Sequence, residues 1–332
     1  MESWNVVFPE AQQVEIRKEP FDPALGRMEI LCRSVASLIS TGTELQCLRG
    51  IFDAGTNWSE WVKYPFQPGY LTTAEVLEAG PDVTGIRAGD RVNAGHSHAQ
   101  YFKIEARDVY LLPREISAEQ GLWLSLAKTT QLGVRRAELQ LGETVGIVGL
   151  GLLGQLVAQY AYLSGAREIF AIDPAASRLE LLPKKPGIRP LPMDAGAARE
   201  AVRAATEGKM LDVVFDVTGH PSVLAQATLL VKPFGRVVLL GDTSVPSQQT
   251  LGPNVVSDSI SILGIHALKN YRDWNHPAMS GLFLQYLIQG RMDIGPLITH
   301  RYSPMDAPEA YGLLANNRSS AMGVLFDWTL LN

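Results

Sequence analysis

Apolar and polar residues follow two different patterns along the chain, and the change comes near residue 117. Before that point, short runs of alternating or clustered β-branched and apolar residues are separated by turn signals such as Asp22-Pro23 and Gly80-Pro81-Asp82. Short strands joined by turns at this spacing are typical of a β-barrel or sandwich. We therefore expect strands at residues 11–16, 27–35, 71–79 and 101–104.

From Ser117 onward the pattern becomes helical and then alternates between strand and helix. Ser117 followed by Gln120 is typical of a helix start, and apolar residues continue to about Leu139. Near-continuous apolar strands then alternate with helices, which indicates a doubly wound parallel sheet covered on both faces. We expect strands at 144–148, 168–172, 213–217, 236–240 and 259–264 and helices at 152–164 and 175–182, with Pro183, Pro186 and Pro190 interrupting the chain.

The first strand of this alternation runs directly into a G-x-G-x-x-G loop. Gly149 permits the tight turn from strand to helix, and Gly151 lets a pyrophosphate approach the backbone. Gly154 lets the helix lie against the strand. The free N–H groups at the helix start, including those of Leu152 and Leu153, would meet the phosphates. This order predicts a dinucleotide site; the alternative is a glycine-rich turn without a nucleotide.

An acidic residue ends the next strand and bears on the kind of dinucleotide. Asp173 lies 22 residues after Gly151, where a carboxylate can accept hydrogen bonds from ribose hydroxyls and would repel a 2′-phosphate. This favours NAD(H), although Ser177 and Arg178 leave some room for NADP(H). Two further strand ends, at Thr218 and Gly241, are expected to line the cofactor crevice.

Composition narrows the class of partner. The chain has 332 residues, enough for two domains, and a formal net charge of −5, which argues against nucleic acid or an anionic membrane surface. No apolar run approaches the roughly 20 residues of a membrane span, and the N-terminus does not read as a signal peptide. The only cysteines, Cys32 and Cys47, suit a reducing compartment. We expect a soluble cytoplasmic protein that acts on a small molecule.

Several motifs together resemble the medium-chain dehydrogenase/reductase superfamily. Gly89-Asp90-Arg91-Val92 looks like its G-D-R-V turn, residues 149–154 match its cofactor loop, and residues 298–301 and 306–311 look like its C-terminal strand and helix. The resemblance implies a GroES-like β-barrel substrate domain at 1–125, a Rossmann domain at 126–275 and a return of 276–332 to the first domain. It also implies an active cleft between the domains and a homodimer.

The chain departs from the zinc-binding members at the metal-ligand positions. Ser40 stands where those members place the first Cys ligand, and Pro68-Gly69-Tyr70 stands where they read P-G-H-E. The third ligand position, near residues 125–129, has no Cys, and the four-cysteine structural zinc lobe is missing. Hydroxyl groups replace Cys and His ligands poorly. We therefore expect no zinc.

Within the superfamily, residues 39–44, 68–70 and 297–301 resemble a narrower group. It contains the dehydrogenase that oxidises the hydroxyethyl side chain of bacteriochlorophyllides, and many relatives described as zinc-binding alcohol or threonine dehydrogenases. The tetrapyrrole substrate is not carried over, because turn and strand motifs report the fold while pocket residues choose the substrate.

Without zinc, a positioned side chain must exchange a proton with the substrate oxygen. Tyr70 is a candidate, or it merely fills the vacated space. Lys128 could lower a neighbouring pKa or bind an anionic group, or it is a solvated residue. The loop with Ser40, Thr43 and Glu44 could lie under the nicotinamide or serve as a cap, with Glu44 orienting a base or capping a helix.

Two other segments allow competing interpretations. His96 and His98 are interpreted as histidines at the surface or at a domain interface, since no nearby Cys, Asp or Glu completes a ligand set. Residues 52–66 contain Trp58, Trp61 and Tyr64. These aromatic side chains could form a lid over a ring substrate or pack beneath a long loop.

The leading hypothesis is a zinc-independent, NAD(H)-dependent oxidoreductase that interconverts a secondary alcohol, possibly a polyol or ring substrate, and its ketone by hydride transfer. One alternative is an NADPH-dependent enone or quinone reductase, which Asp173 disfavours. The other is a non-catalytic NAD(H)-binding sensor or subunit, which the lack of an unambiguous acid–base group allows.

Overall fold

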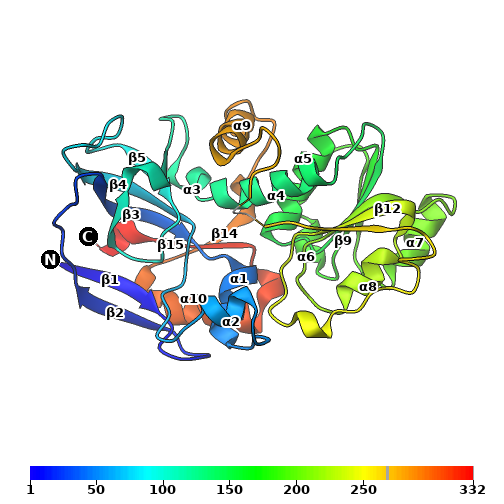
Figure 1. Ribbon diagram of the computed structural model, residues 1–332, viewed down its shortest axis with the longest axis horizontal. Helices are drawn as coiled ribbons and strands as arrows, with labels where there is room; N and C mark the ends of the chain where they lie inside the picture. The colour runs from blue at the N-terminus through cyan, green and yellow to red at the C-terminus, as the bar shows by residue number, and fades with distance from the viewer. Residues whose placement is uncertain (267–268, 332) are drawn as a thin grey trace. The chain divides into compact units, whose positions relative to one another are not determined.

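The computed structural model describes residues 1–266 and 269–331. Two compact units make up the chain: residues 1–125 with 282–332, and residues 126–281. Figure 1 labels their helices and strands. Two helices, α4 (Leu124–Arg136) and α9 (His276–Ile288), continue across the boundaries in sequence between the units.

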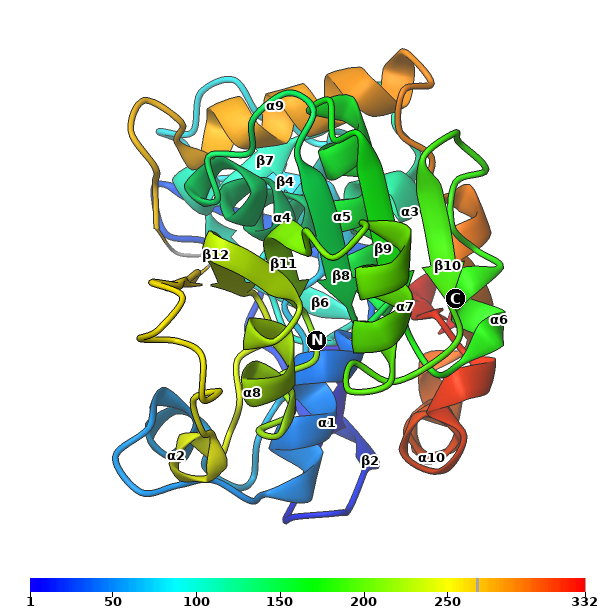
Figure 2. The same cartoon turned by 90° about the vertical axis from the view of Figure 1, so that its right-hand side faces the viewer.

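The unit of residues 126–281 contains a six-stranded sheet in which all neighbours are parallel. Its strand order, β10-β9-β8-β11-β12-β13, is the 3-2-1-4-5-6 order of a doubly wound dinucleotide fold. Figure 2 shows β12, β11, β8, β9 and β10 side by side. The strands are β8 (Thr144–Val148), β9 (Glu168–Ile172), β10 (Ile188–Leu191), β11 (Leu211–Asp216), β12 (Val231–Leu239) and β13 (Ser261–Gly264).

Helices cover both faces of this sheet. Val148 shares a buried cluster with residues of α7 (Ala198–Ala205) and α8 (Val223–Thr228). Its neighbour Ile147 faces α5 (Leu152–Leu163), and successive strand residues point to opposite faces. A short helix, α6 (Ala176–Leu179), follows β9. The prediction of an α/β fold with a parallel sheet is confirmed.

The other unit is built on a second, largely antiparallel sheet of seven strands. Its path is β14-β15-β3-β4-β5-β7, with β6 also paired to β3, and a separate hairpin joins β1 to β2. The C-terminal strand β15 pairs with β3, so the end of the chain joins the sheet built by its beginning (Figure 1). The strands are β1 (Glu2–Val7), β2 (Glu15–Pro20), β3 (Glu29–Leu38), β4 (Thr72–Ala79), β5 (Arg91–Ala94), β6 (Tyr101–Glu105), β7 (Val109–Leu111), β14 (Ile298–Tyr302) and β15 (Gly323–Asp327).

Among the described residues, the α-helices that lie wholly within this unit are α1 (Thr41–Arg49), α2 (Asn57–Trp61), α3 (Ala118–Gly121) and α10 (Ala307–Asn316). One buried apolar cluster joins residues from β1, α1, α2, α10 and β15. It includes Phe8, whose ring meets the Tyr311 ring edge-on at a centroid distance of 5.1 Å. Residues from both ends of the chain therefore share one core.

Several predicted elements are confirmed and two are wrong. Ser117 and Gln120 form the capping box expected from their spacing, although the apolar stretch that follows divides into α3 and α4. The strand expected at 11–16 is largely a turn, in which Gln12 has a φ of 64°, and the strands lie on either side of it. Pro190 does not break the chain but lies in β10, an edge strand, where a missing N–H is tolerated.

Candidate active-site residues

The glycine loop after β8 has backbone features that only glycine supplies. Gly149 has a φ of 93°, in the left-handed region, and its N–H donates to the Ile172 carbonyl oxygen at 2.9 Å. A Cβ on Gly154 would lie 2.0 Å from the Gly149 carbonyl oxygen. Helix α5 therefore packs directly on the turn, at a distance that a side chain would prevent.

Gly151 is different, because nothing in the protein requires glycine there. A Cβ built on it meets no atom within 4 Å, and its φ of −72° is ordinary. Gly151 is the N-cap of α5 and has no side chain with which to cap that helix start. The N–H groups of Leu152 and Leu153 lie in the first turn. Open space beside uncapped N–H groups fits the pyrophosphate of a dinucleotide.

Asp173 lies one residue beyond β9 with only 2% of its surface exposed. Its carboxylate accepts hydrogen bonds from the Leu150 and Ala175 N–H groups, each at 2.8 Å, and Arg178 Nη1 lies 3.3 Å from Oδ2. Asp173 thus connects the glycine loop to the end of β9. Each carboxylate oxygen has two lone pairs, so these contacts occupy Oδ2 and leave one acceptor place on Oδ1, enough for one further hydroxyl donor.

Thr218 and Gly241 follow the carboxyl ends of the adjacent strands β11 and β12. The Thr218 hydroxyl donates to Asp216 Oδ1 at 2.7 Å, and its N–H donates to the same oxygen at 3.0 Å. Burial raises the pKa of Asp216, although these hydrogen bonds oppose the shift. The edge of the sheet that carries the glycine loop therefore also has polar groups at the carboxyl end of the neighbouring strand β11.

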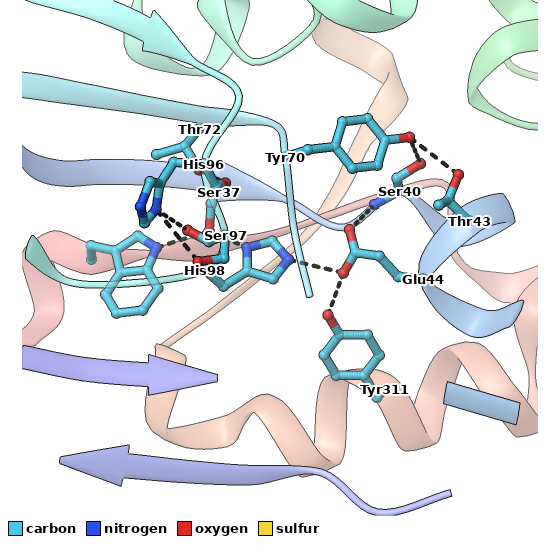
Figure 3. Close-up of polar contacts among 11 residues, drawn as sticks. Ser37, Ser40, Thr43, Glu44, Tyr70, Thr72, His96, Ser97, His98 and Tyr311 are labelled. Atoms are coloured by element: carbon cyan, nitrogen blue, oxygen red, sulfur yellow. Dashed lines mark hydrogen bonds and ion pairs between the residues drawn. The ribbon is translucent and has the colours of Figure 1, made fainter. Parts of the chain in front are cut away.

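Three hydroxyl groups meet in the other unit, and Figure 3 shows this hydroxyl triad of Ser40, Thr43 and Tyr70. Ser40 is the N-cap of α1, Thr43 lies in its first turn, and Tyr70 precedes β4. Tyr70 Oη lies 2.5 Å from Ser40 Oγ and 3.2 Å from Thr43 Oγ1. Burial raises the pKa of Tyr70 while these two hydrogen bonds lower it. Tyr70 is therefore a neutral phenol with two hydroxyl partners.

Glu44 lies beneath the triad, and only 1% of its surface is exposed. Its Oε1 accepts a hydrogen bond from the Ser40 N–H at 2.7 Å. Its Oε2 lies 3.0 Å from His98 Nε2 and accepts a hydrogen bond from the Tyr311 hydroxyl (Figure 3). Glu44 thus caps the start of α1, because it accepts the N–H of the N-cap residue Ser40, and its role in orienting a base stays a prediction.

The interpretation of His98 as a surface or domain-interface histidine is wrong. The residue is fully buried, and its partner Glu44 lies 54 positions earlier in the chain. His98 Nδ1 also lies 2.7 Å from Ser37 Oγ. His96 is partly buried and stacks on Phe102 with a centroid distance of 4.2 Å. Sequence analysis missed His98 and Tyr311 as neighbours of Glu44, because no local pattern relates such distant positions.

Lys128 lies on α4 and is partly buried. Burial lowers the pKa of its ammonium group, and no ion pair to Lys128 is found among residues 1–266 and 269–331. Its contact with a substrate anion stays a prediction.

The aromatic residues of the segment 52–66 form a packed group. Trp58, in α2, is 8% exposed and stacks on Phe52 at a centroid distance of 6.2 Å. Trp61 is half exposed and meets the Phe66 ring edge-on at 5.2 Å. Packing thus explains the position of the Trp58 side chain, but it does not explain why half of the Trp61 surface is exposed.

The residues at the hydroxyl triad do not fit a catalytic zinc ion. Zinc takes thiolate, imidazole and carboxylate ligands, whereas the triad offers three hydroxyl groups and the Glu44 carboxylate is already engaged. Within the described part of the chain, no group of three His, Cys, Asp or Glu side chains is arranged to hold a metal ion.

The amino-acid sequence is similar to a known protein family and to known dehydrogenases. Residues 153–282 match the zinc-binding dehydrogenase family. The L-threonine 3-dehydrogenase of Caldanaerobacter subterraneus subsp. tengcongensis is 28% identical over 320 residues, which covers 84% of this chain and 86% of that protein. The Pyrococcus horikoshii L-threonine 3-dehydrogenase is 28% identical over 331 residues, covering 88% and 89%.

The fold has close counterparts among solved structures. The 2R,3R-butanediol dehydrogenase of Bacillus subtilis superposes with a TM-score of 0.80 at 21% identity, over 98% of this chain and 99% of that one. No helix in the described residues combines the length and apolar character needed to cross a bilayer. The homodimer, the cytoplasmic location and the link to the bacteriochlorophyllide group stay predictions. By fold, by the match of residues 153–282 and by its relatives, the chain is similar to alcohol dehydrogenase-like oxidoreductases of the medium-chain dehydrogenase/reductase superfamily.

Proposed function

We propose that the protein interconverts a secondary alcohol and its ketone, with NAD(H) as the hydride carrier and without zinc. The observation that carries this proposal is the hydrogen-bonded Tyr70 hydroxyl between Ser40 and Thr43, at the positions where the resemblance leads us to expect metal ligands. The names of the relatives suggest a secondary alcohol such as a diol, and the aromatic segment 52–66 is the reason to include ring substrates.

Tyr70 Oη is the atom proposed to exchange the proton. A bound nicotinamide supplies or accepts the hydride. During ketone reduction, negative charge develops on the substrate oxygen, and a neutral phenol can donate its proton there. The Ser40 and Thr43 hydroxyls, at 2.5 and 3.2 Å, would then stabilise the phenolate that remains. In the reverse direction the same phenolate accepts the alcohol proton.

The cofactor is proposed to lie on the glycine loop. Gly149 and Gly154 shape the turn, the space beside Gly151 would take the pyrophosphate, and Asp173 would accept a hydrogen bond from one ribose hydroxyl. The ion pair with Arg178 offsets part of the Asp173 charge. That ion pair is the observation that keeps a second candidate, an NADPH-dependent enone or quinone reductase, under consideration.

The proposed zinc independence predicts that purified protein contains no stoichiometric zinc and keeps its full activity in a strong chelator. The physical reason is the hydroxyl donor set, which binds zinc weakly. Atomic emission measures the metal, and dehydrogenase activity is followed by NADH absorbance. A zinc-dependent alcohol dehydrogenase treated in parallel should lose its activity. Chelator-sensitive activity that zinc restores would contradict the proposal.

The proposed preference for NAD(H) predicts tighter binding of NADH than of NADPH, by about 10- to 100-fold, because one like-charge contact costs about 1–3 kcal/mol near a protein surface. Fluorescence titration measures both dissociation constants. Asp173→Ser should reduce this ratio, whereas Asp273→Ser, at an exposed aspartate of the same unit, should leave it unchanged. Tighter binding of NADPH by the unaltered protein would favour the enone reductase.

A further inference from the structure

The hydroxyl triad is held from both sides by one buried polar cluster. We propose that Glu44 and His98 are positioning residues that hold Tyr70 in place for proton transfer, and that Tyr311 anchors Glu44 from the C-terminal segment. This inference rests on the proposed role of Tyr70. The added residues do not contact the substrate. They hold Tyr70, which does.

Glu44 holds the side of the triad that comes from α1. Its carboxylate accepts the Ser40 N–H at 2.7 Å, and the Ser40 hydroxyl lies 2.5 Å from Tyr70 Oη. Thr43 is the residue directly before Glu44 in the same helical turn. Both hydroxyl partners of Tyr70 therefore belong to a segment whose position depends on the Glu44 side chain.

His98 holds the other side, the segment that leads into Tyr70. The backbone N–H of His98 donates to the Pro68 carbonyl oxygen at 2.8 Å. Gly69, with a φ of 105°, lies so close that an added Cβ would be 2.9 Å from the imidazole carbons Cγ and Cδ2. The same imidazole reaches Glu44 at 3.0 Å. His98 thus joins the two segments that meet at the triad, through its backbone N–H at Pro68 and through its buried side chain beside Gly69 and Glu44.

The hydrogen bonds around His98 favour one position for the hydrogen on its imidazole ring. Trp328 Nε1–H donates to Ser37 Oγ at 2.8 Å, so the Ser37 hydroxyl can give its own hydrogen to His98 Nδ1 at 2.7 Å. His98 then carries its hydrogen on Nε2 and donates it to Glu44. This assignment of the hydrogens gives each of them an acceptor.

The Glu44 carboxylate receives hydrogen bonds from three separate segments. The donors are the Ser40 N–H, His98 and Tyr311, and Tyr311 lies 267 positions away in the chain. No lysine or arginine among the described residues forms an ion pair with Glu44. A buried carboxylate is costly unless such donors surround it, and apolar packing would stabilise the fold equally well. The polar cluster provides a fixed geometry of its hydrogen-bonded groups, which apolar packing would not provide.

The first test measures position in the protein without cofactor. Glu44→Gln places an amide N–H where His98 and Tyr311 both donate, so the cluster must rearrange. Hydrogen exchange at the Ser40 amide should become at least tenfold faster. Tyr311→Phe keeps the buried ring and removes one donor, and it should act in the same direction if Glu44→Gln does not fold. Glu60→Gln, at an exposed glutamate of α2, is the matched control. Unchanged exchange in both cluster variants would overturn the inference.

The second test asks whether Glu44 acts through Tyr70. With 2R,3R-butanediol and L-threonine as probes, Glu44→Gln should lower kcat by at least tenfold while KM changes less. In a Tyr70→Phe background the same substitution should have almost no further effect, because its target is gone. Equal losses in both backgrounds would show that Glu44 acts elsewhere. Full activity of Tyr70→Phe alone would instead refute the proposed function, and the exchange measurement would still judge the positioning role.

Discussion

Replacing Tyr70 with phenylalanine is expected to lower kcat by about 10²- to 10⁴-fold, the usual contribution of a positioned acid or base. The substitution removes only the hydroxyl that lies 2.5 Å from Ser40 and 3.2 Å from Thr43. Because the glycine loop belongs to the other unit, the dissociation constant for NADH should stay the same. Steady-state rates and fluorescence titration on one preparation measure both quantities.

Two further variants make this result specific to the triad. Ser40→Ala keeps the Tyr70 proton donor but removes its nearer partner, so it should lower kcat by a smaller factor. Tyr162→Phe, at an exposed tyrosine of α5, should change neither kcat nor stability. Thermal unfolding of each variant separates lost chemistry from lost structure. If folded Tyr70→Phe has an unchanged kcat, the Tyr70 side chain only fills space and does not transfer the proton.

Two glycines of the loop, Gly154 and Gly151, should differ in how one added methyl group affects the free energy of unfolding. Gly154→Ala places its Cβ 2.0 Å from the Gly149 carbonyl oxygen and 3.0 Å from its carbon, so α5 must move away from the turn. Overpacking of this kind costs about 1–3 kcal/mol of unfolding free energy. NADH binding should weaken as well, because the displaced helix start no longer faces the phosphates.

Gly151→Ala tests the ligand rather than the fold. Its Cβ meets nothing within 4 Å and its φ is ordinary, so the free energy of unfolding should not fall. The dissociation constant for NADH should nevertheless rise by at least tenfold, since a pyrophosphate would occupy that space. Denaturant unfolding and NADH titration on both variants give the comparison. Unaltered NADH affinity in Gly151→Ala would mean that no phosphate approaches the loop there.

Local patterns were sufficient for the glycine loop and for the strands and helix next to it. Strands β8 and β9 match their predicted ranges, and α5 begins at Leu152 as expected. The reason is that a parallel strand buried on both faces is apolar throughout, and a G-x-G-x-x-G turn has to obey steric limits within six residues. Strands with few apolar residues were harder to predict. Strand β2 consists mostly of charged residues, and the strand expected at 11–16 was placed too early in the chain to coincide with it.

The proposed catalytic half depended on contacts between distant segments. Tyr70 and Ser40 could be chosen as candidates because they stand at metal-ligand positions, and Thr43 because it lies in the same hydroxyl-rich loop, but their hydrogen bonds could not be predicted. His98 was misjudged because a histidine among small and polar neighbours gives no sign of burial. Its burial is possible only because Glu44 and Ser37, more than fifty positions away, supply its hydrogen-bond partners.

The amino-acid sequence by itself thus determined the alternation of strands and helices, the turn that suits a dinucleotide and the absence of cysteine at the proposed ligand positions. These are properties of short stretches, where periodicity and glycine sterics act within a few residues. Only the tertiary structure decided that Glu44 would become a buried acceptor for Ser40, His98 and Tyr311. That outcome depends on which distant segments share a core, because a buried charge is tolerated only where the fold brings donors to it.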